Sequence, residues 1–486
     1  MNATPSFREA PSFLQATAPA WVLLALLLYG LVLRPLAFAQ VPLALEAIFV
    51  FAASFAFAEL FFLGFSWGEI QGAIIHRLGR ALPAIFILFA IGLLVGAWII
   101  SGTIPMLVAW GVTLVTPSGI YPLAFLIPIL FSLLTGTSWG SAGTIGVVLM
   151  GIGLSIGADP AVLAGAIIGG AYFGDKLSPL SDTTNIAAIA TDVPLFTHIR
   201  AMLWTTLPAA LLALAVYTAV GLLHPPAPTA DLAAPEAFAE ALASLFTFHP
   251  LLLLPPLLVL AGAWRGIPTL PLLLLSIVVA SALALLIQPF DAAEVTQALR
   301  SGYRLSFSEN AGALPAGVST LLERGGLYSM SEAIFIAMLV FLFVGALDLL
   351  DTMPRLVNRA FAFAKGPTAL VLSALGATAV TNAMTSNQSA TSFIVGDAFA
   401  RRFNSAGVPR ALLSRSIEDT GTMLESLVPW HATALFMVAT LGVPVAAYAP
   451  WQLLSLFNFA FAVLFAVFGQ GVMRAPGPAL KKDERP

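Results

Sequence analysis

The chain has 486 residues, of which 59% are hydrophobic and 9% are charged, and its formal net charge is −3. Soluble proteins carry roughly 25% charged residues, so this composition excludes a soluble fold and predicts a protein whose solvent is the lipid bilayer. No basic cluster suggests a nucleic-acid partner, and the absence of cysteine excludes disulfides and thiolate metal sites.

The predicted transmembrane helices are long apolar runs rich in Leu, Ala and Phe. A helix needs about 20 apolar residues to cross the hydrocarbon core of a bilayer. We therefore predict an all-α membrane protein, a polytopic helical bundle of about 10–14 segments. The clearest runs are residues 18–33, 42–65, 81–100, 201–223, 249–263, 267–287, 333–350, 368–380 and 432–468. The first run lacks a small-residue cleavage pattern and is expected to be a retained helix.

Two stretches, about half the chain apart, have closely similar sequences. Residues 84–108 (AIFILFAIGLLVGAWIISGTIPMLV) and 333–357 (AIFIAMLVFLFVGALDLLDTMPRLV) match without a gap at 12 of 25 positions. The offset then changes from 249 to 248, where TSWGSAGT at 137–144 returns as TSNQSATS at 385–392. Duplication within an apolar chain is typical of secondary transporters, whose binding site lies where the repeats meet.

The distribution of Lys and Arg predicts that the two repeats cross the membrane in opposite directions. Arg77 and Arg80 precede the first copy, whereas Arg355, Arg359 and Lys365 follow the second. Under the positive-inside rule this asymmetry indicates inverted-topology repeats. The same rule places further basic residues in the cytoplasm, namely Arg401, Arg402, Arg410 and Arg415, and the tail residues Arg474, Lys481, Lys482 and Arg485.

These features predict five parts. They are an N-terminal segment with the first transmembrane helix (1–40), a first transport repeat (41–223), a Pro/Ala-rich linker with room for one short amphipathic helix (224–249), a second transport repeat (250–472) and a cytoplasmic tail (473–486). The linker is shorter than the roughly 100 residues that a separate catalytic domain would need.

The densest polar sequence within an apolar region is GDKLSPLSDTTN, residues 174–185. Pro179 removes a backbone donor and disfavours a helix at Ser178, so this segment predicts an interrupted helix. The break would place free carbonyl groups beside two carboxylates, Asp175 and Asp182, and beside hydroxyl and amide groups. Oxygen ligands of this kind suit an alkali cation, and a buried carboxylate equally suits a proton.

The alternative interpretation of this segment is an interfacial loop in which Lys176 pairs with Asp175 or Asp182. Against it, a second polar, Pro-interrupted stretch lies between apolar runs in the other half, at residues 418–431 (EDTGTMLESLVPWH). Loops that only connect helices need not match across the halves. We therefore expect Thr422 and Glu425 to contribute to the ion site, and the charge partners or pH-tuning groups to be Lys176, Glu418, Asp419 and His431.

Two further segments, TGTSWGSAGT and MTSNQSATS, contain small and hydroxyl residues with almost no charge. Each could form the tip of a re-entrant hairpin whose helix N-termini face the site. The candidate ligands are Thr137, Ser138, Thr385, Ser386 and Asn387. The alternative is close helix packing through small residues, which is common in membranes.

Several strings resemble a known family. AGAIIGGAYFGDKLSPLSDTTNIAA, TGTSWGSAGTIGVVLMGIG and LSRSIEDTGTMLESLVPW are similar to the signatures of NhaC-type Na⁺/H⁺ antiporters of the ion transporter superfamily. The resemblance implies an inner-membrane exchanger, built from two inverted repeats, that drives Na⁺ out with the proton gradient. Each repeat would contain a re-entrant hairpin and an interrupted helix. It also suggests a homodimer, and implies no cofactor beyond the transported Na⁺ and H⁺.

The same resemblance assigns roles to residues. The first-repeat motif of the family is matched at Asp175, Ser178, Asp182, Thr183 and Asn185. Asp175 and Asp182 thereby become the expected Na⁺-binding carboxylates that exchange Na⁺ for H⁺, and Thr137 and Ser138 would supply neutral oxygens.

The second half departs from the family pattern at three places. Asn387 replaces an acidic residue, Glu425-Ser426 replaces Ser-Pro, and His431 replaces Asn. Glu425 aligns with Ser178 at an offset of 247, so it could face the same cavity and replace the missing charge. His431 could tune the pH response, although a lone histidine at a helix end is more often structural.

We therefore predict an antiporter that exchanges Na⁺, or Li⁺, for H⁺ by alternating access, with both ions competing for buried carboxylates. The alternative within the family is a Na⁺- or H⁺-coupled exchanger of malate, lactate or amino acids, in which Lys176 or Arg415 would meet a substrate carboxylate.

Two other classes are disfavoured. Residues 136–140 (GTSWG) fit the G-x-S-x-G pattern of serine hydrolases, but the strand-turn-helix context is missing and the second copy loses the glycines. A passive channel fits poorly with inverted repeats, which serve alternating access. The expected protein is therefore a transporter and not an enzyme.

Overall fold

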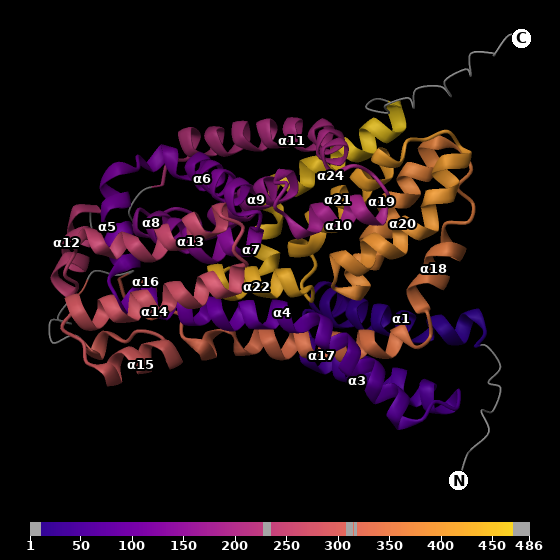
Figure 1. Ribbon diagram of the computed structural model, residues 1–486, viewed down its shortest axis with the longest axis horizontal. Helices are drawn as coiled ribbons and strands as arrows, with labels where there is room; N and C mark the ends of the chain where they lie inside the picture. The colour runs from indigo at the N-terminus through magenta and orange to yellow at the C-terminus, as the bar shows by residue number, and fades with distance from the viewer. Residues whose placement is uncertain (1–10, 227–234, 308–313, 315–317, 470–486) are drawn as a thin grey trace, which may run out of the picture.

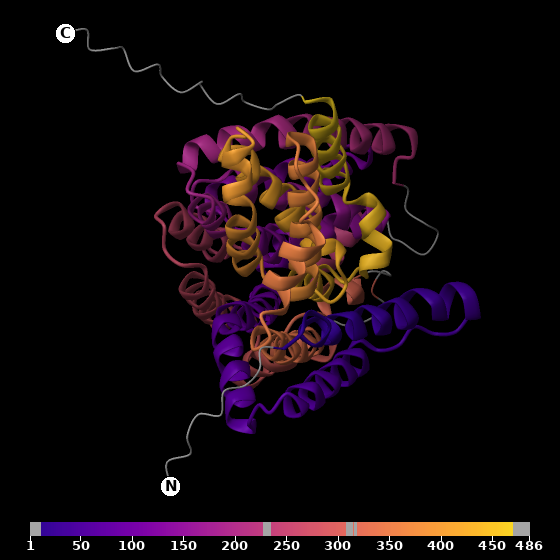
Figure 2. The same cartoon turned by 90° about the vertical axis from the view of Figure 1, so that its right-hand side faces the viewer.

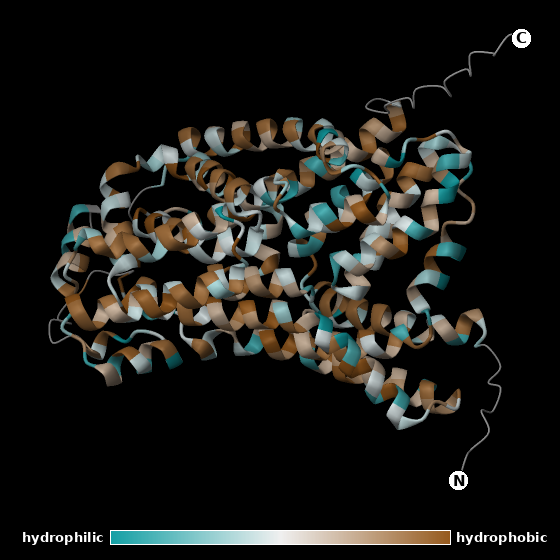
Figure 3. Ribbon diagram, in the orientation of Figure 1, coloured by the Kyte–Doolittle hydropathy of each residue, from teal (hydrophilic) through white to brown (hydrophobic). Residues whose placement is uncertain are grey.

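The computed structural model describes residues 11–226, 235–307, 314 and 318–469, and every regular element in these ranges is a helix. Within the described ranges, nine helices are long and apolar enough to cross a membrane, or up to twelve if each of three bent helix pairs forms one span. Figure 3 shows hydrophobic residues along much of α11 (Leu195–Leu223) and α14 (Thr269–Ile287), and hydrophilic residues on α10 (Asp182–Ala190) and on the peripheral helix α18 (Thr352–Ala360). The chain is therefore an all-α polytopic membrane protein, as its composition predicts.

Among the residues that the structure describes, the first half of the chain supplies eleven α-helices (Figure 1). Their bounds are α1 (Phe13–Leu27), α2 (Arg34–Phe38), α3 (Leu45–Phe62), α4 (Trp67–Ile100), α5 (Thr103–Leu114), α6 (Ile120–Thr135), α7 (Ser138–Ser141), α8 (Val147–Ser155), α9 (Pro160–Leu177), α10 (Asp182–Ala190) and α11 (Leu195–Leu223).

The second half supplies the remaining α-helices. Their bounds are α12 (Pro235–Leu245), α13 (Leu254–Trp264), α14 (Thr269–Ile287), α15 (Ala292–Ser301), α16 (Val318–Leu322), α17 (Ser331–Asp348), α18 (Thr352–Ala360), α19 (Pro367–Thr385), α20 (Gln388–Ser405), α21 (Arg410–Leu424), α22 (Ala432–Leu441), α23 (Val445–Tyr448) and α24 (Leu453–Phe468). Figure 2 shows α1 and α3 on the opposite side of the molecule from α11.

Helix α4 is longer than the apolar run at 81–100 predicts. Ser66 and Glu69 form a capping box, in which each side chain accepts a hydrogen bond from the other residue's backbone N–H, and this box starts the helix upstream. The added turns contain Arg77, which is 4% exposed and donates to the carbonyl oxygen of Thr385 at 3.0 Å. Arg77 is thus a buried group that joins α4 to the end of α19.

The two copies of the repeated sequence begin in α4 and α17, and these two helices pack against each other in antiparallel orientation. A Cβ on Gly92, late in α4, would lie 2.6 Å from the carbonyl oxygen of Gly326, just before α17. At the other end of α17, a Cβ on Gly345 would lie 2.9 Å from Cα of Ile74, early in α4. Both copies also break at the same point, because Gly102 and Asp351 adopt positive φ angles of 85° and 50° before the next helix.

The predicted apolar run at 432–468 is not one helix. It divides into α22, α23 and α24, because Gly442 ends α22 in the left-handed conformation and Pro444 follows it. The predicted linker contains the amphipathic helix α12, whose buried residues Phe238 and Leu242 belong to the face that packs beside α5.

The expected cytoplasmic position of Arg415 is wrong. This residue lies within α21 and is 2% exposed, in the interior beside Asp419. An arginine paired inside a bundle looks the same in sequence as one that flanks a membrane. The predicted cytoplasmic tail lies outside the described residues.

Candidate functional site

The first interrupted helix is formed by α9 and α10. α9 ends at Leu177 and α10 begins at Asp182, as the sequence around Pro179 predicts. The carbonyl oxygens exposed by the break are partly satisfied by Asn185, whose Nδ2 donates to Pro179 at 2.9 Å and to Ser181 at 2.6 Å. Asn185 therefore stabilises the break.

Two other predicted ligands of the first half are also engaged near the break. The hydroxyl group of Ser178 donates to the carbonyl oxygen of Leu133 at 2.9 Å and so fixes the break to α6. The hydroxyl groups of Thr183 and Ser181 lie 3.0 Å apart. The hydroxyl groups of Ser178 and Thr183 are therefore already hydrogen-bonded in this conformation.

The second interrupted helix is formed by α21 and α22, which bend by 46° at a short break. α21 passes into a 3₁₀ turn at Glu425–Leu427, and α22 begins after His431. Nδ1 of His431 accepts the backbone N–H of Thr433 at 3.2 Å, and Oε2 of Glu425 accepts the hydroxyl group of the same residue at 2.8 Å. Glu425 and His431 are thus held at this break.

Two helix pairs carry the predicted hairpin tips. α6 joins α7 through Gly136 (φ 67°) and the N-cap Thr137, and α19 joins α20 through Ser386 (φ 49°) and the N-cap Asn387. The same local conformation therefore recurs at an offset of 250 residues, whereas alignment of the similar sequences TSWGSAGT and TSNQSATS predicts an offset of 248. The caps pair Thr137 with Asn387, not with Thr385.

Each tip contacts an interrupted helix. The backbone N–H of Ser138 donates to Oδ2 of Asp175 at 3.0 Å. On the other side, the hydroxyl oxygen of Ser386 accepts the backbone N–H of Ala432, at the start of α22, at 2.9 Å. Thr385 and Asn387 are engaged within their own tip, through Thr391 and the N–H of Ala390 respectively.

Asp175 and Asp182 differ in their surroundings. Asp175 is buried, and its Oδ1 has no hydrogen-bond partner among the described residues. Asp182 is exposed, and its Oδ1 accepts the backbone N–H of Thr183 at 2.9 Å. The expectation that both carboxylates are buried is wrong for Asp182, which starts α10 and accepts one of the free N–H groups of the first turn.

Two further buried carboxylates come from the second half. Oε2 of Glu418 accepts the hydroxyl group of Thr422 at 2.7 Å, and its Oε1 has no partner in the described part of the chain. Glu425 is 7% exposed. Both carboxyl groups lie within electrostatic range of Asp175. The two segments therefore lie near each other, and the predicted ligand Thr422 is hydrogen-bonded to Glu418.

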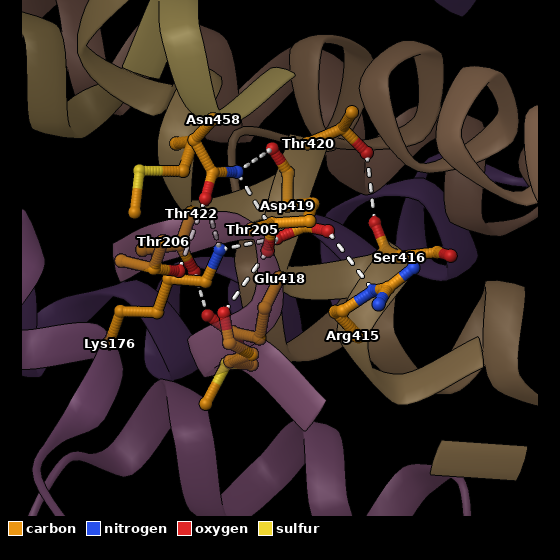
Figure 4. Close-up of polar contacts among 12 residues, drawn as sticks. Lys176, Thr205, Thr206, Arg415, Ser416, Glu418, Asp419, Thr420, Thr422 and Asn458 are labelled. Carbon is orange, nitrogen blue, oxygen red and sulfur yellow. Dashed lines mark hydrogen bonds and ion pairs between the residues drawn. The ribbon is translucent and has the colours of Figure 1, made fainter. Parts of the chain in front are cut away.

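Lys176 forms an ion pair with Asp419 (Figure 4). Its Nζ lies 2.6 Å from Oδ1 of Asp419, and Arg415 reaches the other carboxylate oxygen at 3.6 Å. The hydroxyl group of Thr205 and the amide group of Asn458 also donate to Oδ1, at 2.8 and 3.1 Å. Lys176 therefore does not pair with Asp175 or Asp182, as the loop interpretation would require.

The buried charges in this region do not balance. Its carboxylates exceed its basic groups by two, the members being Asp175, Glu418, Asp419 and Glu425 against Lys176 and Arg415. An uncompensated buried charge costs several kcal/mol, so the excess must be neutralised by protons or by a cation. No group of three or more His, Asp or Glu residues in the described ranges is arranged to hold a metal ion.

Sequence reasoning missed Gln388, Thr205 and Asn458. Asn458 carried a signal, because it is a lone amide in the apolar sequence of α24. Gln388 follows the predicted ligand Asn387 and is 5% exposed. Its correspondence to Ser138 becomes apparent only when the two tips are aligned by their N-cap residues, Thr137 and Asn387.

Together, the apolar helices, the two interrupted helices and the buried carboxylates define a secondary transporter. Comparison with known sequences gives the family: the profile of the Na⁺/H⁺ antiporter family matches residues 170–470. The chain belongs to this family.

Relatives are similar over almost the whole chain. An uncharacterized Na⁺/H⁺ antiporter of Haemophilus influenzae is 35% identical over 96% of this chain and 97% of its own. The Na⁺/H⁺ antiporter NhaC of Alkalihalophilus pseudofirmus is 33% identical over 87% of this chain and 89% of its own. The arginine/ornithine antiporter ArcD of Halobacterium salinarum is 33% identical over 95% and 93% respectively.

Proposed function

We propose that this protein exchanges Na⁺, or Li⁺, for H⁺ across the inner membrane, and that both ions compete for Asp175. The observation that carries the proposal is the state of its carboxyl group. Oδ2 is held by the backbone N–H of Ser138 at the first tip, whereas the buried Oδ1 has no partner among the described residues. A carboxylate fixed through one oxygen and open at the other can take either a proton or a cation.

Competition at one carboxylate couples the two ions. A proton on Asp175 makes the group neutral, and Na⁺ beside it compensates the charge, so either state avoids an unpaired buried charge. The two states exclude each other at the same oxygen. A transporter that changes its accessible side only with an ion bound would therefore exchange one ion for the other.

We propose alternating access between two inverted repeats, residues 41–223 and 250–472. The antiparallel packing of α4 and α17 supports this proposal, as do the matching breaks at Gly102 and Asp351. In this arrangement the tips at Gly136 and Ser386 belong to re-entrant hairpins. The cytoplasmic C-terminus and the homodimer are parts of the same proposal.

The test is dissipation of an imposed proton gradient in proteoliposomes of the purified protein when Na⁺, Li⁺ or K⁺ is added. Asp175→Asn should abolish the Na⁺ response, and Asp182→Asn should weaken it less because Asp182 is exposed. Asp192→Asn is the matched control, since Asp192 forms a surface ion pair with Arg410 and its side chain is 92% exposed. Wild-type exchange by Asp175→Asn would refute the proposal.

The second candidate is exchange of an amino acid, which the name of the Halobacterium salinarum relative favours, or of a small organic anion. The site geometry favours the inorganic cation instead. Lys176 and Arg415, the basic groups that would meet a substrate carboxylate, both contact Asp419. Arginine, ornithine, malate and lactate should therefore produce no flux in the same vesicles. If dissipation of the proton gradient required one of these compounds, exchange of that compound would be the function in place of simple Na⁺/H⁺ exchange.

A further inference from the structure

We propose that Glu418 and Gln388 complete the cation site that begins at Asp175, so that the bound Na⁺ receives ligands from both halves of the chain. This inference rests on the proposed exchange at Asp175. It adds a second carboxylate and a neutral amide oxygen, and it places the exposed Asp182 outside the site.

The position of Gln388 corresponds to that of Ser138. Each is the first residue of the helix that follows a tip in the left-handed conformation. Ser138 meets the carboxylate of Asp175 on α9, the first interrupted helix. The side chain of Gln388 lies near the carboxylate of Glu418 on α21, the second interrupted helix. The two tips therefore present equivalent positions to one carboxylate each.

The side chain of Gln388 is held in a defined orientation. Its Nε2 donates to the carbonyl oxygen of Ile417 at 3.3 Å, which turns Oε1 away from that backbone group. The side chain also lies against Gly421, where an added Cβ would be 2.2 Å from Oε1. Only glycine at position 421 leaves room for the amide. The fold thus admits a polar side chain here and fixes its nitrogen.

Three buried oxygens remain without a hydrogen-bond partner among the described residues: Oδ1 of Asp175, Oε1 of Glu418 and Oε1 of Gln388. Their side chains are at most 5% exposed. All three are acceptors when the carboxyl groups are ionised, so they cannot satisfy one another. A buried acceptor left unpaired destabilises the folded state, and more so when it is charged. A monovalent cation among them would satisfy all three and compensate the two excess negative charges in part.

The competing possibility is that Glu418 carries a proton and donates it to Oε1 of Gln388. That arrangement would satisfy both oxygens without a cation, and Glu418 would then be a proton carrier. The two possibilities predict different results, because a cation ligand determines Na⁺ affinity whereas a proton carrier determines pH dependence.

The experiment measures two properties of Gln388→Met and Glu418→Gln. These are the apparent Na⁺ affinity of exchange in proteoliposomes, and the rise in melting temperature that Na⁺ causes in the detergent-purified protein. We expect each variant to lose about tenfold or more in Na⁺ affinity, which corresponds to about 1.4 kcal/mol of binding energy. The Na⁺-induced rise in melting temperature should shrink in parallel. Gln71→Met, on the exposed surface of α4, should change neither property.

Gln388→Glu keeps the size of the side chain and an oxygen at the site. It should retain the Na⁺-induced rise, so the proposal stays testable if Gln388→Met fails to fold. Wild-type Na⁺ affinity in Gln388→Met would overturn the inference, and so would a Glu418→Gln variant that alters only the pH profile. In either case, loss of Na⁺/H⁺ exchange in Asp175→Asn would still support the proposed function. Wild-type exchange in Asp175→Asn would refute the proposed function itself.

Discussion

The ammonium group of Lys176 lies 2.6 Å from Oδ1 of Asp419, and both side chains are almost fully buried. Lys176 lies in the last turn of α9 and Asp419 lies in α21, so the ion pair joins the two interrupted helices. Thr205 of α11 and Asn458 of α24 bond to the same carboxylate oxygen. Four helices that are distant in sequence thus converge on one charged group.

Removal of Lys176 should destabilise the protein strongly. Lys176→Met would leave the carboxylate of Asp419 with the basic group of Arg415 and the neutral donors Thr205 and Asn458. Breaking a buried ion pair costs about 3–5 kcal/mol. We expect the lower end of that range, because Arg415 stays in contact. The measurement is the free energy of unfolding in detergent. The double variant Lys176→Met/Asp419→Asn should lose less than the sum of the two single variants, and additive losses would contradict the pairing.

Replacement of Gly136 should destabilise the protein for two reasons that can be measured separately. It has a φ of 67°, which costs an L-residue about 1–2 kcal/mol, and an added Cβ would lie 2.7 Å from the carbonyl carbon of Leu180, in the break of α9–α10. Gly407 has a similar φ of 65° but open space around it, so Gly407→Ala measures backbone strain alone. We expect Gly136→Ala to lower the melting temperature more than Gly407→Ala. An equal decrease in melting temperature in the two variants would show that close packing of the tip against the break of α9–α10 makes no contribution.

The sequence predicts the break at Pro179, because Pro removes a backbone donor and restricts the residue before it, and both effects are local. The positions of side chains around the break depend on tertiary packing and are not visible in the sequence. The sequence does not distinguish the surroundings of Asp175 from those of Asp182. In the structure Asp175 is buried, whereas Asp182 is exposed and accepts a backbone N–H at the start of α10.

The register of the second tip is a similar case. The shared letters Thr-Ser suggest an offset of 248, but Ser386 adopts the left-handed conformation that Gly136 adopts in the first copy. This shifts the equivalence by two residues and brings Gln388 to the position of Ser138. Arg415 shows the same limit, since the sequence places Asp419 four residues further along the same helix but does not show that both side chains lie inside the bundle.

The close contact between α6 and α9 should depend on Gly170. An added Cβ there would lie 2.1 Å from the carbonyl oxygen of Phe125, a backbone atom that cannot move aside easily. Gly79, in α4, has no atom within 4 Å of such a Cβ. Gly79→Ala should therefore be neutral, or stabilising by up to about 1 kcal/mol through helix propensity. Gly170→Ala should lower the melting temperature and the yield of folded protein, and a melting temperature equal to that of Gly79→Ala would contradict the packing described for α6 and α9.

His431 should act mainly as a helix cap. Its Nδ1 accepts the backbone N–H of Thr433, so the ring proton resides on Nε2, which lies 3.3 Å from Oδ1 of Asn382. Loss of an N-cap costs about 1 kcal/mol, which we expect for His431→Ala, whereas His431→Asn supplies another good capping side chain. We expect His431→Asn to keep both the melting temperature and the pH profile of Na⁺/H⁺ exchange in proteoliposomes. A profile displaced along the pH axis in His431→Asn, with the melting temperature unchanged, would instead assign His431 the pH-tuning role that its position in the sequence suggests.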